Sequence, residues 1–199
     1  MHFIFLTRCY RTTNIDTIKK NIFALFASQS KHTYQQELIV DMTHGQNKDD
    51  FIAFADEHTH ITLVYTKDEN DKYMYKVIDK VVETLDIENA FTYMLDDDNI
   101  LKSNFLEVLD DYHDEDAIVF KFENNLKMGT PAAIIMGCVG YIDCGSFIVR
   151  LPIMKQFKIG NEESSWEADG RFMQKLLDSG CRVRFLDKKL AYYNALPKP

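Results

Sequence analysis

Apolar residues follow two different spacings along the first half of this chain. Short apolar runs predict β-strands over residues 3–6, 38–40, 61–65 and 91–95. Segments with an apolar residue at about every third or fourth position predict helices over residues 15–26, 51–55, 73–85 and 101–112, the first with Asn14 as a candidate N-cap. Strand and helix therefore alternate, which is typical of a mostly parallel sheet covered by helices on both faces.

The second half of the chain departs from this alternation. Its pattern predicts strands over residues 117–122, 144–151 and 183–186, and a tail over 190–196. A helix is predicted over residues 166–179, with Gly180 as its C-terminal cap. Because we find neither a repeat nor a linker-like segment, we expect one domain over residues 1–199.

Composition and charge narrow the class of protein. Hydrophobic residues make up 46 % of the 199 positions and aromatic residues 13 %, so we expect a globular chain with a sizeable core. The net charge of -8 argues against nucleic acid as the main ligand, because its phosphate backbone calls for a basic stripe. A small phosphorylated ligand stays compatible with this charge, since one cation and a few local basic side chains can neutralise it.

The spacing of the cysteines and the length of the apolar stretches bear on the cellular compartment of the protein. Cys9, Cys138, Cys144 and Cys181 have no Cys-x-x-Cys spacing, and we expect them to be reduced thiols. No apolar stretch approaches the length of a membrane span, and the first residues lack the pattern of a signal peptide. We therefore expect a soluble, cytoplasmic protein without a transmembrane segment.

Three consecutive acids follow the apolar run at residues 91–95. Asp96, Asp97 and Asp98 would lie at the carboxyl end of a buried strand, where open α/β sheets bind their ligands. Mg²⁺ and Mn²⁺ prefer oxygen ligands, often one or two carboxylates with phosphates and waters in the other positions. We therefore predict a metal site at Asp96 and Asp98. The competing interpretation is a solvated acid run, since 31 residues are Asp or Glu.

The order of these motifs resembles the GT-A fold glycosyltransferases, in particular the family 2-like enzymes, over nearly the whole chain. The matching segments are the Thr-containing turn at residues 5–11, the acid Asp41 after the second strand, Leu-Asp-Asp-Asp-Asn at 95–99, and residues 141–150 and 166–172. The resemblance implies an α/β GT-A fold with a mostly parallel central sheet, flanking helices and a smaller second sheet. It also implies a nucleotide-binding half over about 1–100 and an acceptor and catalytic half over about 101–199.

The resemblance further implies a reaction and its residues. A sugar would move from a nucleotide sugar to the hydroxyl of a glycan or another acceptor, as in carbohydrate biosynthesis, with inversion at the anomeric carbon. Asp96 and Asp98 would bind Mn²⁺ or Mg²⁺, and Asp169 would be the general base. Contacts with the nucleotide, UDP by frequency in the family or else GDP, would come from Thr7, Arg8, Arg11, Asp41 and Asp97. Contacts with the sugar or acceptor would come from Asp143, Gly145, Trp166 and Glu167.

Two departures from the family pattern bear on these assignments. Many family members have adjacent Glu-Asp at the base, whereas this chain has Glu167-Ala168-Asp169. An acid at that place is otherwise interpreted as a helix cap or first-turn residue. Some members also supply a late histidine to the metal, and no histidine follows His113. Asn194 is a substitute ligand or simply the end of a strand.

Other interpretations of the acid cluster fit less well. Phosphatases of the haloacid dehalogenase type need Thr or Val at the fifth place of the motif, which is Ile100 here. A calcium-binding EF-hand needs an oxygen ligand and a glycine where Ile100 and Leu101 stand. His58 and His60 alternate without a third ligand, so we expect no metal there. A GT-A scaffold that binds nucleotide sugars without turnover stays as the alternative function.

Overall fold

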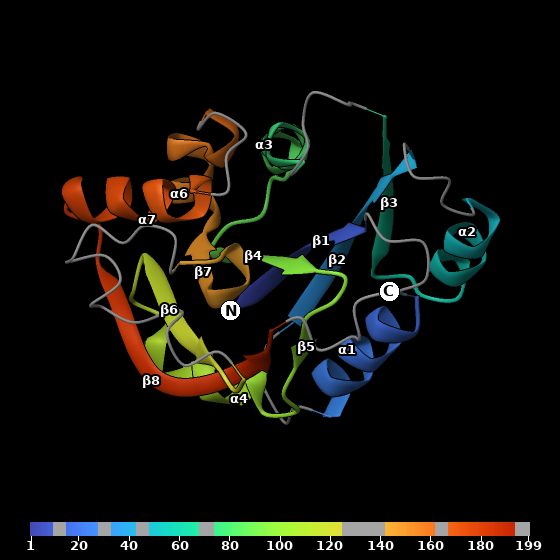
Figure 1. Ribbon diagram of the computed structural model, residues 1–199, viewed down its shortest axis with the longest axis horizontal. Helices are drawn as coiled ribbons and strands as arrows, with labels where there is room; N and C mark the ends of the chain where they lie inside the picture. The colour runs from blue at the N-terminus through green and yellow to red at the C-terminus, as the bar shows by residue number, and fades with distance from the viewer. Residues whose placement is uncertain are drawn as a thin grey trace.

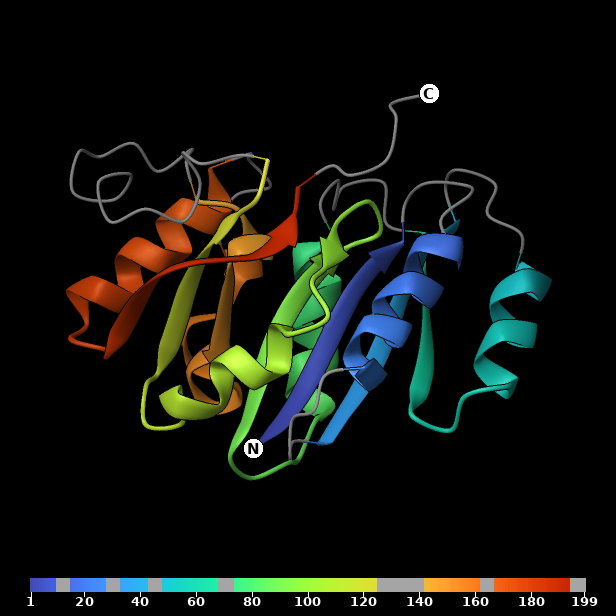
Figure 2. The same ribbon diagram turned by 90° about the horizontal axis from the view of Figure 1, so that it is seen from below.

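An eight-stranded sheet organises the protein in the computed structural model, which describes residues 1–9, 15–27, 33–42, 48–67, 74–124, 142–161 and 167–193. The strand order is β3-β2-β1-β4-β7-β6-β8-β5. Its first four members run parallel to one another: β3 (Ile61–Thr66), β2 (Thr33–Asp41), β1 (His2–Cys9) and β4 (Ala90–Asp96). The carboxyl ends of β1, β2 and β4 therefore meet at one edge, which lies at the top of Figure 2.

The other four strands continue the same sheet. They are β7 (Phe147–Arg150), β6 (Ala117–Phe122), β8 (Val183–Tyr192) and β5 (Ile100–Leu101). Because β7 pairs antiparallel with both β4 and β6, it joins the two halves of the chain. The smaller second sheet that we expected is thus not separate among the described strands. The expected α/β fold with a mostly parallel sheet is confirmed, and the antiparallel pairs of β7 and of β5 make the sheet mixed.

Helices cover both faces of the sheet. In Figure 1, α3 (Tyr75–Thr84), α6 (Leu151–Phe157) and α7 (Ala168–Asp178) lie above it, whereas α1 (Ile15–Ala27) and α4 (Phe105–Leu109) lie below. A further helix, α2 (Lys48–Asp56), packs beside β3 at the edge.

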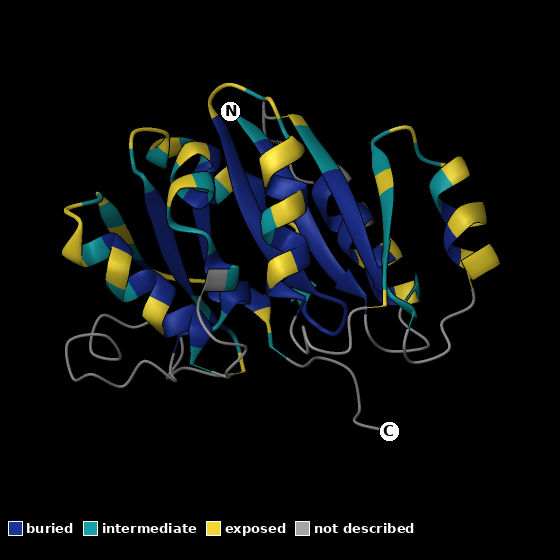
Figure 3. Ribbon diagram, turned by 90° about the horizontal axis from the view of Figure 1, so that it is seen from above, coloured by how far each residue is buried: buried dark blue, intermediate teal, exposed yellow. Residues whose placement is uncertain are grey.

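The alternation of side chains along β1 explains the two layers. Successive side chains of a strand point to opposite faces. Ile4 and Leu6 accordingly pack in the apolar cluster beneath α3 and α7, and Phe3 and Phe5 pack in the cluster with α1 and α4. Since both faces are covered, β1 from Phe3 onward and all of β4 are buried, as Figure 3 shows for the central strands.

Several predicted elements differ from the structure. β8 runs unbroken over Val183–Tyr192, where we expected a strand over 183–186 and a tail over 190–196, and α6 was not predicted. The apolar spacing over residues 101–112 predicted a helix, but Ile100 and Leu101 form β5 and only Phe105–Leu109 is helical, followed by a 3-10 turn. Pairing with β8 and a hydrogen bond from the Leu101 N–H to Asn21 Oδ1 (2.8 Å) hold the first residues extended. The strand predicted over 144–151 begins only at Phe147, because Cys144–Ser146 form a 3-10 helix capped by Asp143, and it ends at Arg150, where α6 begins with Pro152 in its first turn.

The end of α7 is as predicted. Gly180 has a φ of 80°, a conformation that glycine adopts at little cost. Its N–H donates to the Leu177 carbonyl (3.0 Å) and the Cys181 N–H donates to the Leu176 carbonyl (3.1 Å). These two bonds form a Schellman cap, which satisfies the last carbonyls of the helix and turns the chain into β8.

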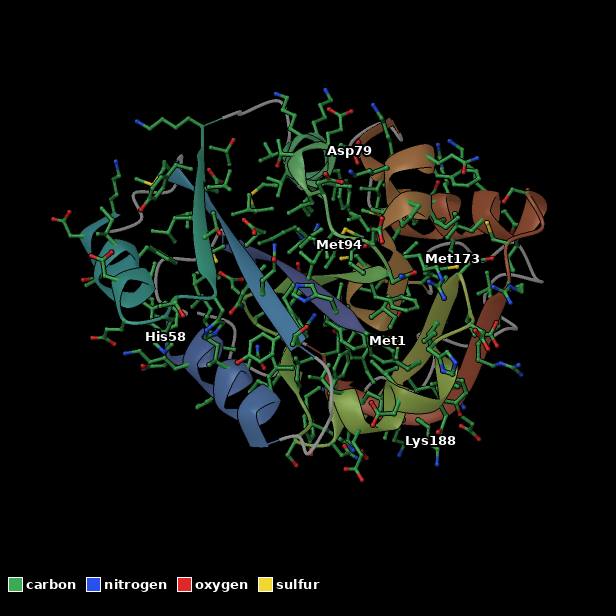
Figure 4. The ribbon with its side chains drawn as sticks, turned by 180° about the vertical axis from the view of Figure 1, so that it is seen from behind. Met1, His58, Asp79, Met94, Met173 and Lys188 are labelled. Atoms are coloured by element: carbon green, nitrogen blue, oxygen red, sulfur yellow. The ribbon has the colours of Figure 1, made fainter. Side chains whose placement is uncertain are left out.

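A close contact joins α3 to the short 3-10 helix η5 (Ile159–Asn161). The Gly160 N–H donates to Asp79 Oδ2 at 2.8 Å, and a Cβ added to Gly160 would lie 2.9 Å from the Lys76 backbone. Figure 4 labels Asp79 on α3, together with Met94 and Met173, which both belong to the apolar cluster beneath this helix. The helix is thus held at its exposed side and packed at its buried side.

No helix within the described ranges is long and apolar enough to cross a membrane.

Candidate functional site

The acid triplet lies where the strand pattern predicted it, at the carboxyl end of β4. Asp96 ends the strand, and Asp97 and Asp98 form the turn that leads to β5. All three are buried, with 7 %, 1 % and 1 % of their surface exposed. The Asp97 N–H donates to the Arg8 carbonyl (3.2 Å), and Asn21 on α1 donates to the Asn99 carbonyl (2.9 Å). The turn is therefore fixed by β1 and α1.

Arg8 forms the centre of the site. It lies opposite Asp96 in the parallel register of β1 and β4, and its Nε and Nη2 are 2.7 and 2.5 Å from Asp96 Oδ1. The same Nη2 is 2.8 Å from the Cys144 sulfur. Burial alone lowers the pKa of Arg8, but Asp96 and the other acidic groups around it raise that pKa well above its usual value. The guanidinium is thus a fixed positive charge at this edge.

Asp143 and Gly145 lie on the segment that enters β7. Asp143 Oδ1 accepts from the Gly145 N–H (2.8 Å), and the Asp143 carbonyl accepts from the Ser146 N–H (2.8 Å), which forms the 3-10 helix Cys144–Ser146. A Cβ on Gly145 would lie 2.8 Å from Asn99 Nδ2 and 3.2 Å from the Phe122 ring. Glycine at this position therefore lets the segment approach the turn that carries the acid triplet.

Asp169 lies in the first turn of α7, and its carboxylate points into the same region. Oδ1 accepts from the Tyr75 hydroxyl at 2.6 Å, and Oδ2 accepts from the Cys144 N–H at 3.0 Å. Burial raises the pKa of Asp169, whereas Arg8 and the hydrogen bond from Tyr75 act to lower it. The side chain is more than a helix cap, because it binds groups from two other elements.

Acidic groups gather here around Arg8. Burial raises the pKa of Asp143 well above the ordinary range of a carboxyl, and the neighbouring Asp96 and Asp169 act in the same direction. One carboxylate oxygen each of Asp96 and Asp143 and the Cys144 sulfur lie within 4.8 Å of one another. Among the described residues this is the group whose donor atoms converge on one point, and Asp98 is not part of it.

The other residues predicted for the site differ in their burial and in their location. Thr7 is fully buried and its hydroxyl accepts from Gln36 Nε2 at 2.8 Å inside the sheet. Asp41 ends β2 at the same edge and is partly exposed. Glu167 pairs with Arg171 (2.6 Å) on the surface of α7. Arg11, Trp166 and Asn194 lie outside the described residues.

Tyr75 and Cys144 were not assigned to the site from the sequence. Tyr75 begins the helix after β3, and such helix starts face the carboxyl edge of a parallel sheet. That rule predicts the neighbourhood of Tyr75 but not its partner Asp169, which is 94 residues away. Cys144 was expected to be a reduced thiol, and it is free, as are Cys9 and Cys181. Cys144 binds Asp169 through its backbone N–H. Any residue other than proline has this group, so the residue type did not reveal the contact.

Comparison with known proteins identifies the fold. No family model matches the chain, and no curated protein matches it by sequence. Among solved structures, S. aureus TarS 1–349 in complex with UDP is similar, with 15 % identity and a TM-score of 0.69 over 97 % of this chain and 60 % of that chain. A mannosyltransferase from Pyrobaculum calidifontis in complex with GDP-Man and Mn²⁺ has 12 % identity and a TM-score of 0.66 over 98 % of this chain and 57 % of that chain.

A third similar structure is closer in length. The inositol-1-phosphate CTP transferase from T. maritima has 14 % identity and a TM-score of 0.60 over 94 % of this chain and 86 % of that chain. The chain spans between 36 % and 60 % of the TarS and mannosyltransferase chains that it matches. At these identities the likeness shows the fold, which is the GT-A type of nucleotide-sugar transferases and confirms the expected fold class.

Proposed function

We propose that this protein transfers a sugar from a nucleotide sugar to an acceptor hydroxyl, with a divalent cation at the carboxyl end of β4 and with inversion at the anomeric carbon. The observation that supports this most is the convergence of Asp96, Asp143 and Asp169 around Arg8 at the ligand-binding edge of a GT-A sheet. Because β7 joins both halves of the sheet, we treat residues 1–199 as one catalytic domain.

The site residues fit a divalent cation. Burial, and after it the neighbouring Asp96 and Asp169, raise the pKa of Asp143, so a cation beside this carboxyl would stabilise its charged form. Oxygen donors at this edge are the ligands that Mg²⁺ and Mn²⁺ prefer, and we assign Asp96 and Asp98 as those that hold the ion. When bound, such an ion stabilises the negative charge that develops on the departing nucleoside diphosphate.

The protein's own groups bind the donor and move the proton. The fixed charge of Arg8, with Thr7, Arg11, Asp41 and Asp97, would bind the nucleotide at the edge formed by β1, β2 and β4. Asp143, Gly145, Trp166 and Glu167 would surround the sugar and the acceptor. Of these, Gly145 lets its segment pack against the turn of the acid triplet, because a side chain there would meet Asn99 Nδ2.

Asp169 is the proposed general base. As the acceptor oxygen attacks the anomeric carbon, the bond from that carbon to the phosphate oxygen breaks and the hydroxyl proton passes to Asp169. Burial raises the pKa of Asp169, which makes its carboxylate a better proton acceptor near neutral pH. Both carboxylate oxygens are already held by one donor each, which fixes the direction of the remaining lone pairs.

We infer that the donor nucleotide is UDP, with GDP as the next choice, because structures similar to this chain bind UDP and GDP-Man. With Mn²⁺ present and all four nucleotides at one concentration, about a hundred times the dissociation constant of UDP, UDP should raise the melting temperature by about 5 to 10 °C. GDP, CDP and ADP should raise it less, and chelation of the metal should remove the effect. If none of the four nucleotides stabilises the protein with Mn²⁺, nucleotide binding at this edge is wrong.

Nucleotidyl transfer is a second candidate, and one observation favours it. This chain covers 86 % of the inositol-1-phosphate CTP transferase, compared with 60 % or less of the TarS and mannosyltransferase chains. The two reactions release different products, because glycosyl transfer yields a nucleoside diphosphate whereas nucleotidyl transfer from a triphosphate yields pyrophosphate. Measuring both products separates them.

A further inference from the structure

Tyr75 joins the first turn of α3 to the proposed base. Its hydroxyl lies 2.6 Å from Asp169 Oδ1, and only 3 % of Tyr75 and 6 % of Asp169 are exposed. A donor and a carboxylate at that distance form a strong, charge-assisted hydrogen bond. Because water has little access to either group, this bond is not replaced easily by one to solvent.

The position of Tyr75 is fixed independently of this bond. The Arg8 guanidinium carbon lies 5.1 Å from the centre of the Tyr75 ring, which is cation–π distance. Behind the ring, Val77, Ile78 and Val81 bury the inner side of α3 in the apolar cluster. On the outer side, the contact from Asp79 to Gly160 holds the helix in place. Arg8 and the packing of α3 therefore hold the phenol in place.

The two hydrogen bonds of Asp169 come from opposite sides. Tyr75 on α3 donates to Oδ1, and the Cys144 N–H before β7 donates to Oδ2. Together they prevent rotation of the carboxylate about its terminal bond, while each oxygen keeps one further lone-pair direction. Burial and the neighbouring Asp169 raise the pKa of Tyr75, so the phenol stays protonated and acts as a donor.

We propose that Tyr75 is a positioning residue for glycosyl transfer, whose hydroxyl holds the Asp169 carboxylate in the orientation in which it takes the proton from the acceptor. This inference rests on the proposed function, and it gives a role to a residue that the resemblance left without one.

The test is the Tyr75→Phe variant, which removes one oxygen and keeps the ring under Arg8. We expect kcat to fall by about 10- to 100-fold, as for loss of a hydrogen bond to a charged group. The KM for the donor and the affinity for UDP with Mn²⁺ should stay within about twofold of the wild-type values. Tyr34→Phe is the matched control, since it removes the buried phenol oxygen of a tyrosine near the amino end of β2. It should leave kcat unchanged.

A double-mutant cycle shows whether Tyr75 acts through Asp169. If it does, Tyr75→Phe should cost no further rate once Asp169→Asn is present. Additive losses in the double variant, or a wild-type kcat in Tyr75→Phe while Asp169→Asn is inactive, would overturn the inference and leave glycosyl transfer standing. A near-normal rate in Asp169→Asn would overturn it too, because Asp169 would not be the base. Absence of turnover in the wild-type protein would remove the proposed function itself, and this inference with it.

Discussion

Replacing Asp169 with asparagine should remove sugar transfer and leave nucleotide binding intact. The carboxylate is the proposed acceptor of the hydroxyl proton, and loss of a general base costs roughly 10²- to 10⁴-fold in rate. The side chain lies at the start of α7, whereas Arg8 and the acid triplet lie on β1, β4 and the turn after β4. We therefore expect kcat to fall within that range while the affinity for UDP with Mn²⁺, measured by calorimetry, changes by less than about threefold.

The geometry indicates that this variant will fold. An asparagine has the same shape, and its carbonyl oxygen can accept from the Cys144 N–H while its amide donates to the Tyr75 oxygen. Asp178→Asn is the matched control, because that acid lies exposed at the other end of α7, where it accepts a hydrogen bond from Gln174 Nε2 (2.9 Å). A near-normal rate for Asp169→Asn would exclude Asp169 as the base. Retention of the anomeric configuration in the product would exclude the inverting course.

The second large effect is expected at Asp98. Loss of a group that only orients a metal ligand typically weakens metal binding by about 10- to 100-fold. Removing a charged ligand should therefore weaken the binding of UDP with Mn²⁺ by at least that factor. The affinity of Asp98→Asn for UDP should then be the same with Mn²⁺ as with a chelator. Titration calorimetry under both conditions measures this. Asp187→Asn is the control, because this acid is exposed and pairs with Lys121 on the surface.

A parallel variant decides which carboxylates hold the ion. The donor atoms of Asp96, Asp143 and Cys144 converge, and Asp98 lies outside that group. If Asp98 is a ligand, Asp98→Asn should lose the dependence on metal and Asp143→Asn should keep it. The opposite result would contradict the assignment from the sequence and move the ion toward Asp143.

The sequence predicted the layered part of the fold because its signals there are local. Unbroken apolar runs at β1 and β4 indicated strands that are covered on both faces, and the acids after β4 indicated a ligand-binding edge. Gly180 was recognisable as a cap because the αL position at a helix end favours glycine. These inferences depend on neighbours in the chain and on strand geometry.

The parts that sequence did not predict depend on distant partners. Leu101 has helical spacing with the residues that follow it, but its pairing with Ala191 in β8 keeps it extended. The contact between Tyr75 and Asp169 spans 94 positions, and the Cys144 contribution comes from a backbone N–H. Such contacts are set by packing, which no local pattern encodes.

Turnover of a nucleotide sugar is the measurement that tests the central claim most directly. The wild-type protein should be incubated with a mixture of nucleotide sugars and Mn²⁺, with and without hydroxyl acceptors, and the released nucleotides identified by mass spectrometry. We predict that one nucleoside diphosphate, expected to be UDP, is released with Mn²⁺ and not with a chelator, since even hydrolysis of the donor requires a working site. If the folded, nucleotide-binding protein consumes no donor under these conditions, it is a binding scaffold and the proposed catalysis is wrong.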